Sequence, residues 1–535
     1  MTQWIDSRQL KANWKVRLTG VLLLAATAWY IPWALTHLNW KAPWLSLPFA
    51  AAMLLAAIMM VVAVINNWSQ RVPVPAPVPE GQEPDVLVII PTYGEPVGML
   101  HNTAKSVLQQ DYPQSRIRLV ISDDGHRRAV RDLVDRLGRE YPDAWVTYHE
   151  PPRRTDARRN GEAKAGNLNS VLEEANRSDH PIGFVETRDA DDLVGDPGFL
   201  RQAIGQLLID SRLAFVQTIK EAQVSPGDPF GNLEPLFYRR LMLKKNAANA
   251  VFPCGSGLVW RRTALNDIGG FPAWNLVEDL QSGLEALRRG WHGLYLPIIG
   301  AMGQTAPEDI PNSIKQRGTW AIDTVRLALW GSRHGLSLRQ QLHFAEMGLF
   351  YMLGYAILIF AVTPIFPLVF NIHPMAGTQV QYATHLWPYV AGIELFLIAL
   401  ADGLAYEKLW RARQILLGMA PVYARAVIIA LRYGPSRKPG YRVTRKEHVF
   451  HLYWREVLPQ FLILLALAAA SVYHLATHSL MRTADLGSLF WATFFVLGLG
   501  QVVRNAWHGV DLRRSLAVGA ARFGQRAGIR RRADG

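Results

Sequence analysis

The sequence predicts an α/β domain with a mostly parallel sheet, placed between two groups of membrane-spanning helices. Three observations support this fold class: long apolar blocks towards both ends, a charged middle in which buried strands alternate with helices, and a basic excess beside the apolar blocks. Hydrophobic residues make up 50% of the chain, which is high for a soluble enzyme and moderate for a pure membrane bundle.

Two apolar segments, residues 16–36 and 44–65, lie near the start of the chain. Each approaches the ~20 residues that a helix needs to cross a bilayer. The first is too long for a signal peptide, lacks a convincing cleavage site and is followed by the second. Residues 71–84 carry prolines at alternating positions, which cannot continue a helix and predict a stiff linker. Residues 1–70 are therefore assigned to two transmembrane helices.

Strands and helices alternate after the linker. Strands are predicted at 86–90, 118–122 and 182–186, and helices at 99–109 and 129–141. This alternation favours a parallel sheet, in which ligands bind at the carboxyl ends of the strands. Asp123 closes the second strand and Asp189 follows the third. We therefore expect a binding site at this edge of a domain that covers residues 85–335.

Apolar segments return after the charged block. Four more spans are predicted near residues 345–370, 387–405, 458–474 and 488–503, which divide the remainder into 336–405, 406–456, 457–506 and a tail at 507–535. The loop at 406–456 is strongly basic. Its apolar stretch, 415–429, favours an interfacial helix, and a further membrane span is the alternative.

Charge predicts the topology. Two spans before the block and four after it place the block and both termini on one side of the membrane. The N-terminus, the 406–456 loop and the tail are basic, whereas short loops on the other side, such as 371–385, carry almost no charge. Under the positive-inside rule, the block and both termini are cytoplasmic.

Composition excludes several other classes of function. Lys and Arg exceed Asp and Glu by 57 to 43, a net charge of +14. The excess clusters beside the apolar spans, so membrane lipid is the expected partner. Neither zinc-ligand spacing nor a base-reading helix is evident, so nucleic acid is not expected. The single cysteine, Cys254, excludes an internal disulfide and a Cys-rich metal site.

Five short motifs follow one another in the charged block. In order they are Asp123-Asp124-Gly125, Lys164-Ala165-Gly166-Asn167, Asp189-Ala190-Asp191, Glu278-Asp279 and Gln316-Arg317-Gly318-Thr319-Trp320. Each alone has an ordinary structural explanation. Asp-Gly pairs form turns, a carboxylate such as Asp279 can cap a helix, and Trp320 can anchor a helix at the membrane interface.

The same residues also offer a chemistry. Asp189 and Asp191 can reach a divalent cation that bridges two phosphates, and Mg²⁺ or Mn²⁺ suits such oxygen ligands. Asp123 can accept hydrogen bonds from a uracil or a ribose. Asp279 can take a proton from an acceptor hydroxyl as a general base. Trp320 offers an aromatic face on which a sugar ring can stack.

Taken together, the motifs resemble the processive family 2 glycosyltransferases, most closely the bacterial cellulose synthase catalytic subunits and their β-glucan (curdlan or mixed-linkage) synthase relatives. The resemblance covers about residues 86–455. Residues 252–256, Phe-Pro-Cys-Gly-Ser, are similar to the family's Phe-Phe-Cys-Gly-Ser segment near the acceptor. Residues 441–446, Tyr-Arg-Val-Thr-Arg-Lys, are similar to its Phe-x-Val-Thr-x-Lys gating loop.

The resemblance implies a GT-A glycosyltransferase domain inserted in an all-α bundle of about six transmembrane helices with interfacial helices, in the bacterial inner membrane. It implies an inverting displacement, in which a hydroxyl of the growing polysaccharide attacks C1 of UDP-glucose, with Mg²⁺ or Mn²⁺ as cofactor. The roles that it implies are donor binding for Thr92, Glu95, Asp123, Asp124, Lys164, Asp189, Gln316 and Arg317; metal binding for Asp189 and Asp191; catalysis for Asp279 with Glu278; acceptor contact for Trp320 and Cys254; and gating for Tyr441, Val443, Thr444 and Lys446.

The chain also departs from the family pattern. Thr319 stands where the family usually has Arg, Asp192 where it often has His, Pro253 where it has Phe, and Gly94 where it has Asn. Several of these changes fall around the acceptor and the diphosphate. They favour a β-1,3 or mixed β-1,3/1,4 linkage, with β-1,4 as the alternative.

Three other functions compete with this interpretation. An amino-sugar polymer synthase that uses UDP-N-acetylglucosamine and a non-processive transferase with a lipid acceptor lie within the same class. A transporter or scaffold with a degenerate domain is disfavoured because all the expected carboxylates are present. The tail at 507–535 lacks the second sequence element of the cyclic-di-GMP-binding PilZ domain that cellulose synthases usually carry, so no PilZ domain is predicted. A separate periplasmic or membrane subunit is an expected partner.

Overall fold

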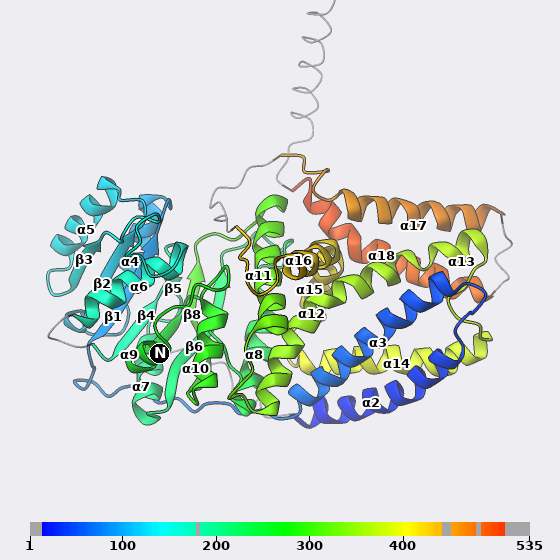
Figure 1. Ribbon diagram of the computed structural model, residues 1–535, viewed down its shortest axis with the longest axis horizontal. Helices are drawn as coiled ribbons and strands as arrows, with labels where there is room; N and C mark the ends of the chain where they lie inside the picture. Colours follow the sequence, from blue (N-terminus) through cyan, green and yellow to red (C-terminus); the bar gives the residue numbers. More distant parts are fainter. Residues whose placement is uncertain (1–12, 178–181, 441–450, 478–482, 509–535) are drawn as a thin grey trace, which may run out of the picture.

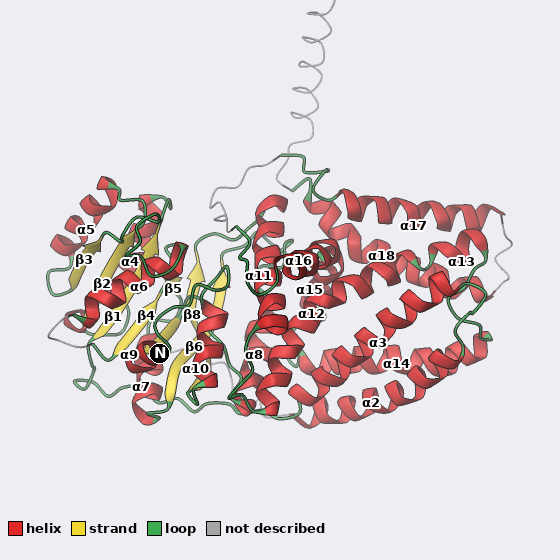
Figure 2. Cartoon of the chain, in the orientation of Figure 1, coloured by secondary structure: helices red, strands yellow, loops and turns green. Residues whose placement is uncertain are grey.

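The computed structural model describes residues 13–177, 182–440, 451–477 and 483–508. A mixed sheet covered by helices stands beside a bundle of long helices (Figure 1). The described strands all lie in the first part, and the second part consists of helices and the loops that join them (Figure 2). The predicted fold class, an α/β domain joined to an all-α bundle, is confirmed.

Eight strands form the sheet of the described chain, in the order β3-β2-β1-β4-β7-β6-β8-β5. They are β1 (Val86–Thr92), β2 (Ile117–Asp123), β3 (Trp145–His149), β4 (Phe184–Thr187), β5 (Asp192–Val194), β6 (Leu213–Ala222), β7 (Leu258–Arg261) and β8 (His292–Gly303). Strands β3, β2, β1 and β4 run parallel, whereas β7 is antiparallel to both β4 and β6. Because each is antiparallel to β7, β4 and β6 point the same way, and their carboxyl ends meet at one edge.

The helices of this domain cover both faces of the sheet and lead to the bundle. They are α4 (Val97–Leu108), α5 (Arg128–Glu140), α6 (Ala163–Asn176), α7 (Phe199–Ile209), α8 (Met242–Lys244), α9 (Arg262–Asp267), α10 (Asp279–Arg288) and α11 (Ile310–Trp330), with shorter turns η1 (Gln114–Arg116), η2 (Phe237–Leu241) and η3 (Lys245–Ala248).

Side chains of β1 alternate between the two faces. Val86, Val88 and Ile90 pack with α4, α5 and α7, whereas Leu87 and Ile89 pack on the opposite face with α6 and α10. All five are at most 3% exposed. Burial on both faces explains why the strand reads as an unbroken apolar run.

The sheet differs from the sequence prediction in the start of one strand. The third strand, predicted at residues 182–186, is β4 and begins at Phe184, because its pairing with β1 starts where Phe184 meets Val86. The sheet is mostly parallel, as predicted, and its antiparallel strands are β5 and β7. Both are short, at three and four residues, and leave little periodicity to detect.

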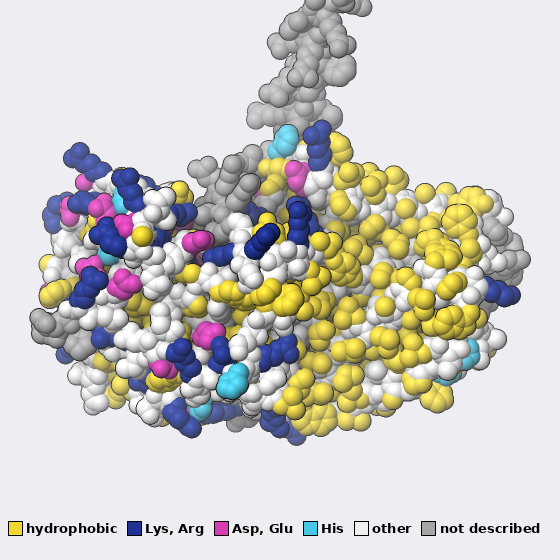
Figure 3. Space-filling model, in the orientation of Figure 1, with side chains coloured by type: hydrophobic (Ala, Val, Ile, Leu, Met, Phe, Trp, Pro, Cys, Tyr) yellow, Lys and Arg dark blue, Asp and Glu magenta, His cyan; other side chains and the backbone are white. Residues whose placement is uncertain are grey.

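The second part of the chain is a bundle of long helices. They are α2 (Asn13–Thr36), α3 (Pro43–Asn66), α12 (Leu338–Val362), α13 (Ile365–Phe370), α14 (Gln379–Leu400), α15 (Tyr406–Gly418), α16 (Ala420–Tyr433), α17 (Leu458–Thr477) and α18 (Thr483–Asn505). Among the described residues, six helices are long and apolar enough to span a membrane. Apolar side chains cover the visible face of the bundle, and charged side chains gather over the sheet domain (Figure 3). The chain is a multi-pass membrane protein, and the expected number of about six spans is confirmed.

The apolar stretch at 415–429 lies across a bend. Helices α15 and α16 meet at 51°, and together they could also count as one further span. Ile415 and Tyr423 pack with Phe230 and Ala321 in an apolar core between the sheet domain and the bundle.

Two carboxylates of the bundle form ion pairs. Glu394 of α14 forms an ion pair with Arg413 of α15 and accepts a hydrogen bond of 2.8 Å from the Tyr406 hydroxyl. Asp402 pairs with Lys15 at 3.3 Å. An ionised group in a membrane is costly unless it is paired, so these contacts reduce the cost of placing both carboxylates in the bundle.

The proline-rich linker is bound along α7. The Ala76 N–H donates to Gln202 Oε1 at 3.0 Å, and the Val78 N–H donates to the Arg201 carbonyl at 3.1 Å. A Cβ on Gly205 would lie 1.8 Å from the Ala76 carbonyl oxygen, so this helix position must be glycine for the linker to approach. The linker is therefore tied to the domain.

Candidate active site

The loops after β1 and β2 form the first part of the site. Glu95 Oε2 accepts hydrogen bonds from the Thr92 hydroxyl at 2.7 Å and from the Tyr93 N–H at 2.9 Å. Arg127 pairs with Asp123 at 3.1 Å and donates to Thr92 Oγ1 at 2.9 Å. Its guanidinium also donates to the Glu95 carbonyl at 2.7 Å. The structure therefore brings Thr92, Glu95 and Asp123 together around one arginine.

Asp124 binds a different arginine, Arg159. Its carboxylate is bound by the Arg159 guanidinium through two contacts, of 2.7 and 2.9 Å. The two side chains are only 4% and 2% exposed. Arg154 also reaches Asp124 at 3.4 Å and lies over the Tyr93 ring, 4.2 Å from its centroid. An arginine-rich loop thus closes over the side of the site where Tyr93 is exposed.

Lys164 occupies the centre of the site. It lies in the first turn of α6, and its Nζ is 2.7 Å from Asp189 Oδ1 and 3.1 Å from Glu278 Oε1. The same ammonium donates to the Gly255 carbonyl at 3.3 Å. It joins three loops that are far apart in the sequence, after β4, before β7 and before α10. Three of the five motifs meet at this one cation.

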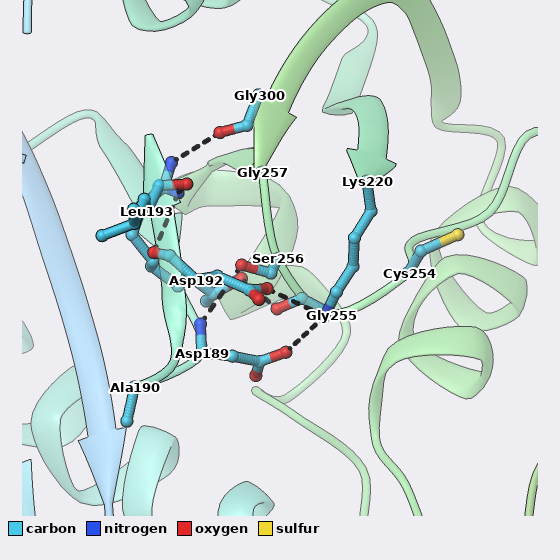
Figure 4. Close-up of polar contacts among 12 residues, drawn as sticks. Asp189, Ala190, Asp192, Leu193, Lys220, Cys254, Gly255, Ser256, Gly257 and Gly300 are labelled. Carbon is cyan, nitrogen blue, oxygen red and sulfur yellow. Dashed lines mark hydrogen bonds and ion pairs between the residues drawn. The ribbon is translucent and has the colours of Figure 1, made fainter. Parts of the chain in front are cut away.

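A second cation, Lys220 near the end of β6, faces Lys164 across Asp189. Its Nζ lies 2.8 Å from Asp189 Oδ2 and 2.8 Å from Asp192 Oδ2 (Figure 4). Both oxygens of Asp189 are therefore paired with lysines. Burial opposes ionisation, but the two cations outweigh it and hold the pKa of Asp189 well below its usual range.

The backbone at Gly255 lets these groups converge. Gly255 has φ +85°, and a Cβ there would lie 3.2 Å from Asp279 Oδ2, 3.4 Å from Lys164 Nζ and 4.0 Å from Asp189 Oδ2. A side chain would be strained in this left-handed conformation and would also fill the space. The neighbouring Ser256 hydroxyl accepts from the Asp189 N–H at 3.2 Å. A carboxylate, an ammonium and a second carboxylate thus surround one glycine.

Asp279 is the first residue of α10, and the N-cap position falls on Glu278, so the interpretation of Asp279 as an N-cap is wrong; its carboxylate belongs to this cluster. Oδ1 accepts from the Leu280 N–H at 2.7 Å. Burial and the nearby Glu278 carboxylate raise the pKa of Asp279 to about 7, against Lys164, which lowers it. A carboxylate that is half-protonated near neutral pH suits a general base.

The remaining predicted residues lie on other elements. Cys254 precedes Gly255, and burial raises the pKa of its thiol, which makes it a poor nucleophile.

Arg317 on α11 pairs with Glu234 and donates to the Gly231 carbonyl at 2.9 Å. Gln316 and Trp320 are half-buried on the same helix. Tyr441, Val443, Thr444 and Lys446, predicted to form the gating loop, lie outside the described residues.

Two carboxylates after β4 are the candidate ligands for a divalent metal. In the described part of the chain, no group of three or more His, Cys, Asp or Glu side chains could hold a metal ion. Mg²⁺ typically takes one or two carboxylates and completes its shell with substrate phosphates. Asp189 and Asp191, two residues apart after β4, are the pair that could supply those carboxylates.

Sequence reasoning missed Lys220 and Arg159. The available signal for Lys220 was a lysine near the end of the otherwise buried strand 213–222, in which the first seven residues are buried. Its meeting with Asp189 depends on β7, which lies between β4 and β6 and makes them point the same way. Arg159 lies in the irregular segment before α6, where sequence patterns carry little information.

Lys220→Met is expected to destabilise the sheet domain. It would leave the Asp192 carboxylate, 1% exposed, without its cation. Breaking a buried pair costs about 3–5 kcal/mol, so the melting temperature should fall. Adding Asp192→Asn should recover most of the loss, which thermal unfolding of the three variants in detergent would measure. An unchanged melting temperature in Lys220→Met would show that the pair is not formed.

Fold and site together define the class of protein. Residues 84–322 match the family model "Glycosyltransferase like family 2". A mannosyltransferase from Pyrobaculum calidifontis, solved in complex with GDP-Man and Mn²⁺, shares the fold: TM-score 0.50 and 20% identity, covering 72% of this chain and 99% of that protein. The sheet domain is a GT-A glycosyltransferase domain.

Two curated relatives are similar to more than half of the chain. The cellulose synthase catalytic subunit (UDP-forming) of Xanthomonas axonopodis pv. citri is 31% identical over 62% of this chain and 45% of its own. That of Pseudomonas fluorescens is 29% identical over 72% of this chain and 51% of its own. These similarities confirm the resemblance to the cellulose synthase-like glycosyltransferases of family 2. The chain spans about half the length of these curated relatives.

Proposed function

We propose that this chain polymerises glucose from UDP-glucose into a β-glucan and passes the product through its membrane bundle. The observation that carries the proposal is the cluster around Gly255, where Asp279 Oδ2, Lys164 Nζ and Asp189 Oδ2 lie within 4.0 Å of one point. It places a base of raised pKa beside a cation, as an inverting transfer from a diphosphate requires. The relatives named cellulose synthase support glucose as the sugar.

In the proposed reaction, one bond forms as another breaks. The acceptor hydroxyl attacks C1 of the α-linked donor, the bond from C1 to the diphosphate oxygen breaks, and the linkage becomes β. Asp279 takes the hydroxyl proton. The Lys164 ammonium stabilises the negative charge that develops on the leaving UDP. A single displacement needs no enzyme nucleophile, in keeping with the raised pKa of the Cys254 thiol.

Mg²⁺ or Mn²⁺, held by Asp189 and Asp191, would add positive charge at the diphosphate when the donor binds. The solved mannosyltransferase complex with Mn²⁺ supports a divalent cation of this kind. Thr92, Glu95 and Asp123 form the proposed nucleoside pocket, and Trp320 the acceptor platform. A cytoplasmic site with both termini on the same side belongs to the same proposal and rests on the charge asymmetry of the loops.

The glycosidic linkage is the most specific part of the proposal. The relatives named above are cellulose synthases, which supports β-1,4. Thr319, Pro253 and Asp192 depart from the family pattern near the acceptor and the diphosphate, which favours β-1,3 or mixed β-1,3/1,4. Asp192, which stands where the family often has His, lies 2.8 Å from Lys220 and so adds a negative charge beside Asp189. We favour the β-1,3 or mixed product on that ground.

A product assay tests the proposal. The full chain in nanodiscs is supplied with UDP-glucose and Mg²⁺ or Mn²⁺, and the polymer is digested with linkage-specific glucanases. Digestion by a β-1,3-glucanase or a mixed-linkage glucanase is the expected result. Complete digestion by a β-1,4-glucanase alone would contradict the linkage and leave the β-glucan assignment standing. Turnover of UDP-N-acetylglucosamine without turnover of UDP-glucose would contradict the donor and support an amino-sugar polymer.

A further inference from the structure

Asp323 is a buried carboxylate outside the five motifs, and it binds the loop that leads to the base. It lies on α11 and is 1% exposed. Its Oδ1 accepts from the Leu276 N–H at 2.9 Å and its Oδ2 accepts from the Val277 N–H at 2.8 Å. Glu278 and Asp279 follow directly in the chain. Each carboxylate oxygen thus holds one N–H of the loop.

Asn275 extends the same attachment. Its side-chain Nδ2 donates to the Asp323 carbonyl at 3.2 Å, and its backbone N–H donates to Gln281 Oε1 at 3.1 Å. Three consecutive residues, 275–277, are therefore tied to α11 or to the first turn of α10. A loop held at every residue gives the next two residues, Glu278 and Asp279, little freedom to move.

The start of the loop is held from a second side. Arg326, one turn further along α11, places its guanidinium over the Trp274 ring at 4.9 Å from the centroid. The Trp274 Nε1–H donates to the Pro435 carbonyl at 2.9 Å, and Lys438 Nζ donates to the Ala273 carbonyl at 2.8 Å. The loop at 273–277 is thus clamped between α11 and residues 435–438.

A buried carboxylate at this position is costly. Burial raises the pKa of Asp323 to about 7, although the two N–H bonds lower it. The N–H groups of Leu276 and Val277 need one acceptor oxygen each, and a carboxylate offers two such oxygens. An amide keeps one acceptor and turns an N–H₂ group towards the other N–H.

We propose that Asp323 is a positioning residue that fixes residues 275–277 against α11 and thereby sets where Glu278 and Asp279 stand beside Gly255. The inference deepens the proposed function and rests on it, because Asp279 is the base of that reaction. Asp323 acts through the loop and does not touch substrate. It also connects the base to α11, the helix that carries Trp320.

The test uses Asp323→Asn in the full chain in nanodiscs. We expect kcat for UDP release to fall on the order of 10²-fold, because displacement of a catalytic group by about 1 Å has that effect. The Kd for UDP, measured by calorimetry, should stay within about threefold, since the nucleoside pocket is elsewhere. Hydrogen–deuterium exchange should speed up in peptides that cover 273–280 and remain unchanged in β1 and β2.

Two further variants make the test specific. Ser313→Ala is the control, because Ser313 is also buried on α11 and its hydroxyl has no hydrogen-bond partner in the described structure. It should leave kcat and exchange unchanged. Asn275→Ala removes only the tie to the Asp323 carbonyl and should lower kcat less than Asp323→Asn does.

An unchanged kcat in Asp323→Asn would overturn the inference. If kcat of Asp323→Asn falls only in proportion to the fraction of enzyme that binds UDP, the loss reflects a folding defect and also overturns the inference. In that case, wild-type kcat and wild-type exchange in Asn275→Ala would confirm that the hydrogen bonds of the loop do not position the base. An inactive wild-type chain would contradict the proposed function instead. The exchange comparison would still decide whether Asp323 holds the loop.

Discussion

Asp279→Asn is expected to abolish polymer synthesis while leaving UDP binding intact. The amide keeps the size of the side chain and can still accept from the Leu280 N–H, which is 2.7 Å from Oδ1. It cannot take a proton from the acceptor hydroxyl. Loss of a general base lowers rates by about 10²–10⁴-fold, so the rate of UDP release should fall by that factor.

The control for this variant is Asp143→Asn, which changes an exposed carboxylate of the same domain. It should have wild-type activity. A transporter with a degenerate domain would keep its flux in Asp279→Asn, so flux that survives without synthesis would contradict the enzyme assignment. Calorimetric titration with UDP shows in parallel that the variant is folded.

The raised pKa of Asp279 also predicts the pH dependence. A base works when it is deprotonated, and the pKa of Asp279 is about 7 in the free enzyme. We expect kcat/KM to fall tenfold per pH unit below about pH 7. Glu278→Gln removes a neighbouring negative charge and should shift this acid limb to lower pH. An acid limb near pH 4 in the wild-type enzyme would contradict the raised pKa of Asp279.

Lys164→Met is expected to weaken donor binding. Nζ of Lys164 lies 2.7 Å from Asp189 and 3.1 Å from Glu278, and it is the cation that stands beside both Asp189 and Asp279. Hydrogen bonds to charged groups contribute about 1.5–3 kcal/mol, so the Kd for UDP should rise about 10–100-fold. Turnover should fall as well, because the leaving diphosphate loses this cation.

The same substitution moves the pH profile in a defined direction. Lys164 lowers the pKa of Asp279, so its removal should raise that pKa and shift the acid limb of kcat/KM upwards, opposite to Glu278→Gln. Lys105→Met, a substitution of a half-exposed lysine on α4, is the matched control and should change neither affinity nor profile. Equal UDP affinity in Lys164→Met and wild type would contradict a role for Lys164 at the diphosphate.

The sequence by itself determined three strands of the sheet, the long apolar helices and the class of chemistry. The apolar run from Val86 is a strand because every side chain in it is buried, and the long apolar segments are helices because a membrane requires them. Asp123 and Asp189 could be placed at strand ends, since hydrophobic periodicity is a local property of the chain. The roles of the site residues stay predictions.

Only the tertiary structure decided which charges meet. Lys220 reaches Asp189 because β7 separates β4 and β6 and makes them point the same way, and Asp323 reaches Leu276 because α11 packs against the loop before α10. Arg317 turned out to be paired with Glu234, a residue that no motif contains. Such contacts join segments tens of residues apart. Their geometry follows from strand order and helix packing, which local sequence patterns do not encode.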